Sequence, residues 1–163
     1  MNKMTATATT ADVDEALRAA EYTFEALKVE ADRLPRMFQD AMRNLDRDAA
    51  LAARRRRGEI DVDLSIAEVR LLQARIAQAE AVAARWNTEA NDKRATAHSV
   101  QAERDQLVAA GASLIEIEQA DVRARHAWDE SRRATNNELL AQGAVARSRT
   151  KLDGKLTQLG GRR

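Results

Sequence analysis

Apolar residues recur at alternating steps of four and three along the first third of the chain, and Asp48 alone interrupts the series. A heptad pattern kept over so many repeats is typical of a helix that buries one face along its length. It predicts a first helix over residues 11–57. The pattern keeps its phase through Pro35, so we expect a kink there rather than a chain reversal. The seam positions are Val13, Leu17, Ala20, Phe24, Leu27, Ala31, Leu34, Phe38, Ala41, Leu45, Asp48 and Ala52.

A second seam follows a capping box. Ser65 and Glu68 have the S-x-x-E spacing in which each side chain satisfies a free amide at a helix start, and Leu64 and Val69 are placed as its hydrophobic staple. We expect a second helix over residues 65–110, closed by a glycine in the left-handed position. Its seam consists of Val69, Leu72, Ile76, Ala79, Ala83, Trp86, Ala90, Lys93, Ala97, Val100, Arg104 and Leu107. The charged ends of Lys93 and Arg104 are expected to reach water.

Ser113 and Glu116 repeat the capping box directly after Gly111. A turn this short forces an antiparallel helical hairpin, so a third helix is predicted over residues 113–159. Its seam weakens between Asn136 and Gly143, where we expect a bend or fraying. The seam begins with Leu114, Ile117, Ala120, Ala124 and Trp128.

Three helices of similar length joined by short turns predict an all-α fold. We expect a long antiparallel three-helix coiled coil, an up-down-up rod, as a single domain over residues 11–160. A disordered leader over 1–10 and a loose tail over 161–163 would flank it. The alternative is an open bundle that other chains share or complete, because a thin alanine-rich core buries little surface per residue.

Composition supports long helices. Aromatic residues make up 3% of the chain, charged residues 33%, and there is a single proline. The net charge of +1 gives no global reason to seek polyanions. Residues 61–119 have 10 acidic and 6 basic side chains, whereas residues 120–163 have 5 and 10, so these segments would attract each other side by side. Cysteine is absent, which excludes a disulfide framework and a thiol nucleophile.

The stretch "ARRRRGEIDVDLSIAE" has three interpretations. Basic residues before Gly58 and acidic residues after it suit the end of one helix and the start of the next. Alternatively, Arg54, Arg55, Arg56 and Arg57 form a polyanion-contact cluster, although Glu59, Asp61 and Asp63 would repel a polyanion. In the third interpretation, Ile60, Val62 and Leu64 alternate with polar residues in an extended segment that docks on a partner.

Other side chains give little chemistry. No Glu lies three residues before His98 or His126, so the E-x-x-H pair of a di-iron helical bundle is absent, and we expect no metal and no cofactor. No phosphate-binding or metalloprotease motif occurs, and no catalytic residues are predicted. Trp86 and Trp128 fall on seam positions, which indicates core packing; partner contact is the alternative, because tryptophan is favoured at interface hot spots.

These observations indicate a non-enzymatic structural or adaptor protein with protein partners, self-association included, and without a small-molecule substrate or a membrane span. In its composition, its RRRRGE stretch and its short leader, the chain resembles small Ala/Arg/Glu-rich coiled-coil proteins of phages and prophages. That resemblance implies a virion or assembly component. The alternatives are a nucleic-acid-associated helical protein that uses Arg54–Arg57 and the basic C-terminal segment, and a phage-type inhibitor of a host protein. The N-terminus has no apolar stretch of a secretory signal, so a cytoplasmic or virion-associated location is expected.

Overall fold

The computed structural model describes residues 10–161, and three helices account for almost all of them. They are α1 (Thr10–Arg43), α2 (Arg47–Ala109) and α3 (Leu114–Gly160), and no described residue lies in a strand. The all-α prediction is therefore confirmed for this part of the chain. Most of the predicted leader and tail, residues 1–9 and 162–163, lies outside the described residues, whereas Thr10 already belongs to α1.

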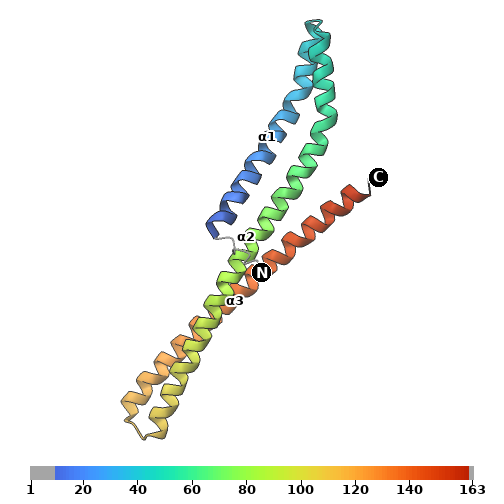
Figure 1. The fold of residues 1–163 in the computed structure, drawn as a ribbon. Helices are drawn as coiled ribbons and strands as arrows, with labels where there is room; N and C mark the ends of the chain where they lie inside the picture. Colours follow the sequence, from blue (N-terminus) through green and yellow to red (C-terminus); the bar gives the residue numbers. More distant parts are fainter. Residues whose placement is uncertain (1–9, 162–163) are drawn as a thin grey trace, which may run out of the picture. The chain divides into compact units, whose positions relative to one another are not determined.

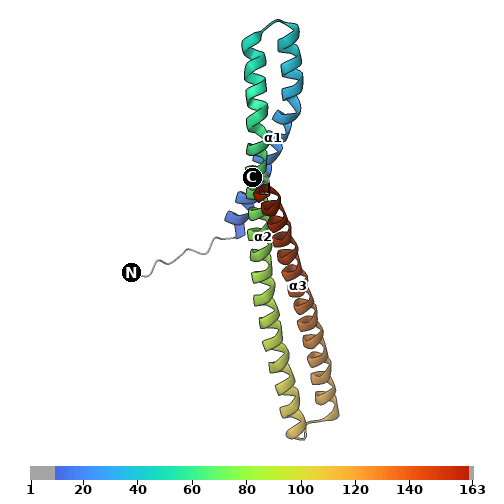
Figure 2. The ribbon, with the colours of Figure 1, turned by 90° about the vertical axis from the view of Figure 1, so that its right-hand side faces the viewer.

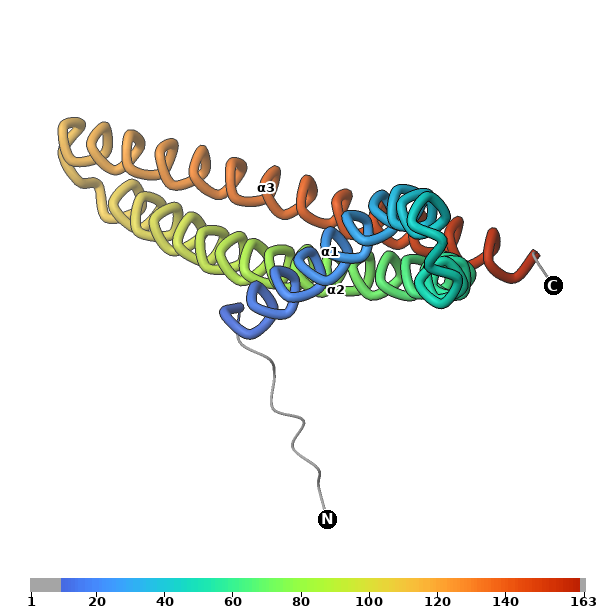
Figure 3. Tube along the Cα trace, turned by 90° about the horizontal axis from the view of Figure 1, so that it is seen from above, coloured from blue at the N-terminus to red at the C-terminus, as the bar shows by residue number. Residues whose placement is uncertain are grey.

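The helices divide between two compact units. One unit contains residues 10–78 and 148–161 of the described chain, and the other contains residues 79–147. In the first, α1 lies beside the first half of α2, as Figures 1 and 2 both show. In the second, the rest of α2 lies beside most of α3 (Figures 1 and 3). The division into units does not test whether residues 11–160 form the single domain that we expected, so that domain stays a prediction.

The heptad seam predicted for the first helix is the face that α1 buries. Leu17, Leu34 and Ala41 are buried, and the seam residues between Val13 and Leu34 are at least half-buried. Pro35 lies inside α1 on the exposed side, so it does not end the helix, as predicted. The kink expected there stays a prediction.

The first turn lies at residues 44–46, not at 58–64 as predicted. The Asp46 N–H donates to the Ala41 carbonyl (2.9 Å) and the Leu45 N–H to the Met42 carbonyl (3.3 Å). This pair of bonds is a Schellman motif, which ends a helix with one residue in the left-handed conformation. That residue is Leu45, with φ 57°. The predicted first helix over 11–57 is therefore too long.

Asp46 also begins α2. Its Oδ1 accepts the Ala49 N–H (2.9 Å), the hydrogen bond of an N-cap. The sequence seam ran through this turn because Leu45 and Ala52 happen to keep the apolar spacing. In the sequence, only Asp48 indicated that the apolar spacing around the turn no longer marked a buried face. In the structure, Leu45 is 90% exposed.

The arginine run and Gly58 lie inside α2, so the helix end and the second helix start predicted there are wrong. Ser65 does not cap a helix; its hydroxyl donates to the Asp61 carbonyl one turn earlier (2.8 Å). Glu68 forms an ion pair with Lys155 of α3. The helix continues because apolar residues at heptad spacing are buried on both sides of Gly58: Ala50, Ala53, Ile60, Ala67 and Leu71.

The second unit follows the predicted seam closely. Ala90 and Ala97 of α2 have no exposed surface. The buried residues of α3 are equally small: Ala120, Ala124, Ala127, Ser131, Ala134 and Ala141. Small side chains on both faces let helix axes approach closely. The helix α3 is continuous through residues 136–143, so the predicted fraying is wrong, whereas the alternative of a bend there stays a prediction.

The second turn is built as predicted. Gly111 has φ 68°, and the Ala112 N–H donates to the Leu107 carbonyl (3.0 Å) in a second Schellman motif. The Ser113 N–H and hydroxyl both donate to Glu116 Oε2 (2.9 and 2.6 Å), and the Glu116 N–H donates back to Ser113 Oγ (3.4 Å). This reciprocal capping box begins α3.

Candidate protein-contact surfaces

Arg56 is the one member of the arginine run that is held inside the fold. Its guanidinium donates to both carboxylate oxygens of Glu30 on α1 (2.6 and 3.0 Å) and to Asp63 on α2 (2.6 Å). These hydrogen bonds hold the pKa of Glu30 below its usual range and raise the pKa of Arg56. Arg56 therefore links α1 to α2 and is not free to contact a polyanion.

The other three arginines of the run are exposed. Arg54, Arg55 and Arg57 make no ion pair with any described residue. Arg54 also lines an apolar recess described below. The four-residue cluster predicted from sequence is thus three free cations and one structural residue.

Ile60, Val62 and Leu64 lie in helical rather than extended backbone, so the predicted docking segment is wrong in conformation. The helix turns the three side chains to different depths. Ile60 is buried at 2% exposure, Leu64 is half-buried and Val62 is 59% exposed. Of the three, only Val62 has a largely exposed side chain.

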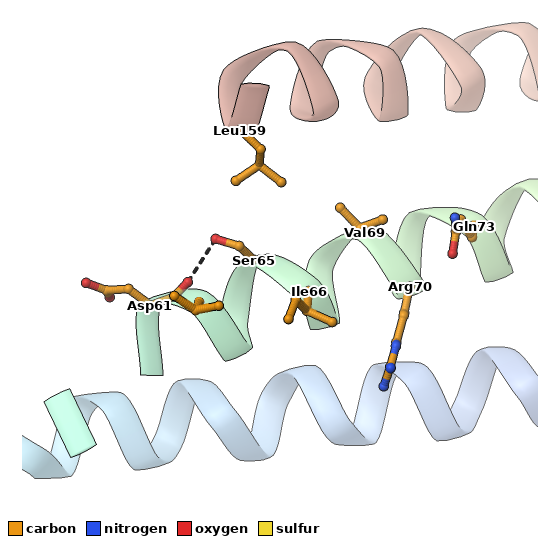
Figure 4. Close-up of a pocket in the computed structure, with 8 residues that line it drawn as sticks. Asp61, Ser65, Ile66, Val69, Arg70, Gln73 and Leu159 are labelled. Carbon is orange, nitrogen blue, oxygen red and sulfur yellow. Dashed lines mark hydrogen bonds between the residues drawn. The ribbon is translucent and has the colours of Figure 1, made fainter. Parts of the chain in front are cut away.

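Val62 belongs to a recess of about 520 Å³ between α2 and the end of α3, within the first unit. Figure 4 shows Leu159 of α3 directed toward the α2 face that has Ser65 and Val69. Ile66 lies beside Val62 in the same lining and is also exposed. The Glu68–Lys155 ion pair joins the same two helices.

A second apolar recess, of about 380 Å³, lies at the turn between α1 and α2. Phe38, Met42, Leu45 and Leu51 supply its apolar lining, and Arg47 and Arg54 its charge. The stretch from Met37 to Leu51 has a high density of large apolar side chains around the "NLD" turn residues. That density was the available signal, but the seam interpretation assigned Phe38 and Leu45 to a core.

The two tryptophans are half-buried in the second unit. The Trp128 ring meets the His98 ring edge to face, with centroids 5.0 Å apart and planes at 82°. The guanidinium of Arg85 lies 5.3 Å from the centre of the Trp86 ring, a cation–π contact. Both tryptophans therefore have partners within the chain, and their role as partner contacts stays a prediction.

Ion pairs between α2 and α3 in the second unit have the opposite polarity to the one expected. Lys93 of α2 donates to Glu130 of α3 (2.7 Å), and Arg104 of α2 donates to Asp121 of α3 (2.7 Å). The hydrogen bond between Lys93 and Glu130 raises the pKa of Lys93 and lowers that of Glu130. The charged ends of Lys93 and Arg104 are thus paired rather than simply hydrated.

The turn between α2 and α3 has an apolar and acidic surface. Leu114 and Ile115 are 84% and 68% exposed, and Val122 is exposed further along α3. Ile115, Glu118, Gln119, Val122 and Arg123 line a shallow recess there. Sequence reasoning placed Leu114 on the buried seam, which is wrong because it precedes the first full turn that α2 covers.

No described residues form a group of three or more His, Asp or Glu side chains arranged to hold a metal ion. Within residues 10–161, no helical stretch combines the length and apolar character that a bilayer crossing requires. The chain matches no protein-family model, no curated protein and no solved structure.

Proposed function

We propose that this protein is a non-enzymatic, coiled-coil structural or adaptor protein that works through contacts with other proteins, self-association included. The observation that carries the proposal is where the large apolar side chains lie. Val62 and Ile66 on α2, like Met42 and Leu45 at the first turn, are exposed in clusters next to charged residues. Exposed apolar patches with a polar rim are characteristic of protein-interaction surfaces.

The proposed architecture is an antiparallel coiled coil. Three polar pairs between α1 and α2 support it: Glu30 with Arg56, Glu21 with Arg75, and Asp14 with Gln78. The residue numbers fall on α1 as they rise on α2, which is the order that antiparallel neighbours give. The heptad spacing of buried residues on both helices supports the coiled-coil geometry.

The resemblance in composition to phage coiled-coil proteins favours a virion or assembly component within this class. An inhibitor that binds a host protein would need the same kind of surface. In either case the partner is recognised by apolar helix faces and their charged edges rather than by a reaction centre.

Photo-crosslinking tests the proposal. A photoreactive phenylalanine analogue is placed at Val62 or Ile66, and at the exposed, charged Lys151 as the matched control, in cells that naturally produce the protein. We expect discrete protein adducts at the two α2 positions and none at Lys151. The proposal is contradicted if Val62 and Ile66 give no adduct while the chain is folded and abundant.

The exposure of Arg54, Arg55 and Arg57 favours nucleic-acid binding as a second candidate. Binding of this kind weakens steeply with salt, and removing a phosphate-binding side chain makes that salt dependence shallower. The triple variant R54A/R55A/R57A should then bind DNA or RNA much more weakly, whereas R56A should bind like the parent chain. Equal losses of affinity in both variants, or no binding at about 0.15 M salt, would rule out this candidate.

A further inference from the structure

The turn between α1 and α2 has an apolar surface with a basic edge, here called the first tip: Phe38, Met42, Leu45, Arg47, Leu51 and Arg54. Leu45 holds the left-handed position of the turn, where glycine is usual, and its side chain projects almost fully into solvent. A leucine in this position costs backbone energy and gains no burial within the chain.

Charge around the first tip is strongly positive. Residues 36–57 contain seven arginines and three aspartates. Arg47 and Arg54 form no ion pair with a described residue, whereas Asp46 is engaged by the Ala49 amide and Asp40 by Arg43. The apolar surface is therefore edged by free cations.

The turn between α2 and α3 has a complementary surface, here called the second tip: Leu114, Ile115, Glu118 and Val122. Residues 103–123 contain five acidic and two basic side chains. Glu118 forms no ion pair with a described residue, while Arg104 is neutralised by Asp105 and Asp121. Arg123 lines the same recess and reduces, but does not reverse, the negative charge.

We propose that the first tip of one copy of this chain docks on the second tip of another copy. The inference rests on the proposed function and names its partner. Apolar side chains would be covered on both sides, and Arg47 and Arg54 would meet Glu118. Two first tips would bring their arginines together, so like-with-like pairing is disfavoured. Because the two surfaces differ, an open assembly always has one unused tip of each kind. Further copies can therefore join, and the assembly grows into chains or closes into rings.

Two variants, each with one tip disabled, test the proposal by light scattering after size exclusion. The parent chain should exceed 18.1 kDa increasingly with concentration. Leu45→Glu should weaken self-association by about 30-fold or more, the effect expected for one hot-spot residue. Ile115→Glu should do the same. Leu140→Glu, which replaces a 70% exposed leucine of α3, is the matched control and should assemble like the parent.

An equimolar mixture of the two variants gives the decisive result. Leu45→Glu keeps its second tip and Ile115→Glu keeps its first, so the mixture should form a species of twice the chain mass and stop there. Circular dichroism verifies folding, and Met42→Glu serves as an independent first-tip variant. Higher salt should weaken every assembly, because part of the attraction is ionic.

Three results would overturn the inference. One is a parent chain that stays at monomer mass up to about 1 mM, which by the affinity scale leaves less than about 4 kcal/mol of attraction. Another is a variant mixture that stays monomeric although neither variant assembles alone. The third is a Leu45→Glu or Met42→Glu chain that assembles like the parent. A monomeric chain that still crosslinks to another protein at Val62 would overturn this inference and leave the proposed function standing.

Discussion

Leu45 is the residue whose conformation and exposure conflict most with ordinary folding preferences. Replacing it with glycine removes the β-carbon that disfavours φ 57°. We expect Leu45→Gly to raise the free energy of unfolding by about 0.5–1 kcal/mol at low protein concentration, measured by urea denaturation. Leu45→Ala removes the same exposed side chain and keeps the β-carbon, so it should give no such gain. Equal effects of the two changes would contradict the strain.

Ser113 and Ser65 each begin an S-x-x-E motif, but the two serines have different roles. Ser113 caps α3, so Ser113→Ala should lower the free energy of unfolding by about 1 kcal/mol. Ser65 lies inside α2 with its hydroxyl on the Asp61 carbonyl, so Ser65→Ala should change stability by less than about 0.5 kcal/mol or raise it slightly. Thermal unfolding of the pair distinguishes the roles, and similar decreases in both variants would refute them.

The two serines show what the sequence predicts at this scale. The box at Ser113 follows Gly111, which can end the preceding helix, and there the prediction was right. The box at Ser65 follows a stretch that stays helical because Ile60 is buried, so no helix end precedes it. A capping motif indicates that a helix can start at that residue. Whether one does start there depends on whether the residues before the motif are held in a helix by burial. The tip surfaces could not be predicted, because periodicity marked Leu45 and Leu114 as core.

At the scale of the element, α2 separates residues that the sequence presented as one group. Ile60 is buried and Val62 exposed, two positions apart on the same helix. Ile60→Ala should therefore lower the free energy of unfolding by about 2–4 kcal/mol, the usual effect of a cavity in a core. Val62→Ala should change it by less than about 0.5 kcal/mol. Urea denaturation compares them, and a large decrease at Val62 would show that its exposed face is covered.

Acid should destabilise two contacts between helices and the cap of α3. Arg56, Ser113 and Lys93 hold the pKa values of Glu30, Glu116 and Glu130 below their ordinary 4.5. A carboxyl with a lowered pKa contributes stability that is present above the unfolded value and lost as the pH falls through the folded value. The free energy of unfolding should therefore decline below about pH 4.5.

The triple variant E30Q/E116Q/E130Q supplies the control for this pH dependence. Its stability near pH 7 should be lower than that of the parent, and its decline below about pH 4.5 should be shallower. Chemical denaturation at several pH values measures both. A decline as steep as that of the parent would assign the acid sensitivity to other carboxyl groups.

Helix faces were more predictable than helix partners. The seam from Val69 to Leu107 was identified from spacing alone, because a 3.5-residue period specifies a face. The sums of charge over residues 61–119 and 120–163 predicted acidic α2 residues against basic α3 residues. Glu68 with Lys155 has that order, whereas Lys93 with Glu130 has the reverse, since a pair depends on the face that each residue occupies and not on the charge of its segment.

At the scale of the whole molecule, the chain consists of two compact units. A cavity made in one unit should loosen that unit more than the other. We expect Ile60→Ala to speed amide hydrogen exchange in residues 10–78 and 148–161 more than in residues 79–147. Mass spectrometry of peptide fragments measures the difference. Equal acceleration in both units would mean that the chain opens as one cooperative body.

Hydrophobic spacing did not predict this division, because it identifies a buried face and not the element that covers it. The long helix α2 has one series of buried residues from Ala50 to Leu71 and another from Val69 to Leu107, which is half-buried except at the buried Ala90 and Ala97. In the sequence the two series follow each other without a gap, and only their heptad phase changes. The change of phase near Leu71 precedes the boundary between the units by a few residues, and it is the sequence feature closest to that boundary.

The division also sets an order of synthesis. The unit of residues 79–147 is a continuous stretch, so every residue that it needs has been translated before Ser148 is added. The other unit combines early residues with the segment from Ser148 onward, and it must wait for the last part to be translated. The first helix to be made therefore belongs to the unit that is completed last. Until the end of α3 is made, Val69 and Glu68 of α2 lack their α3 neighbours and are exposed to other proteins.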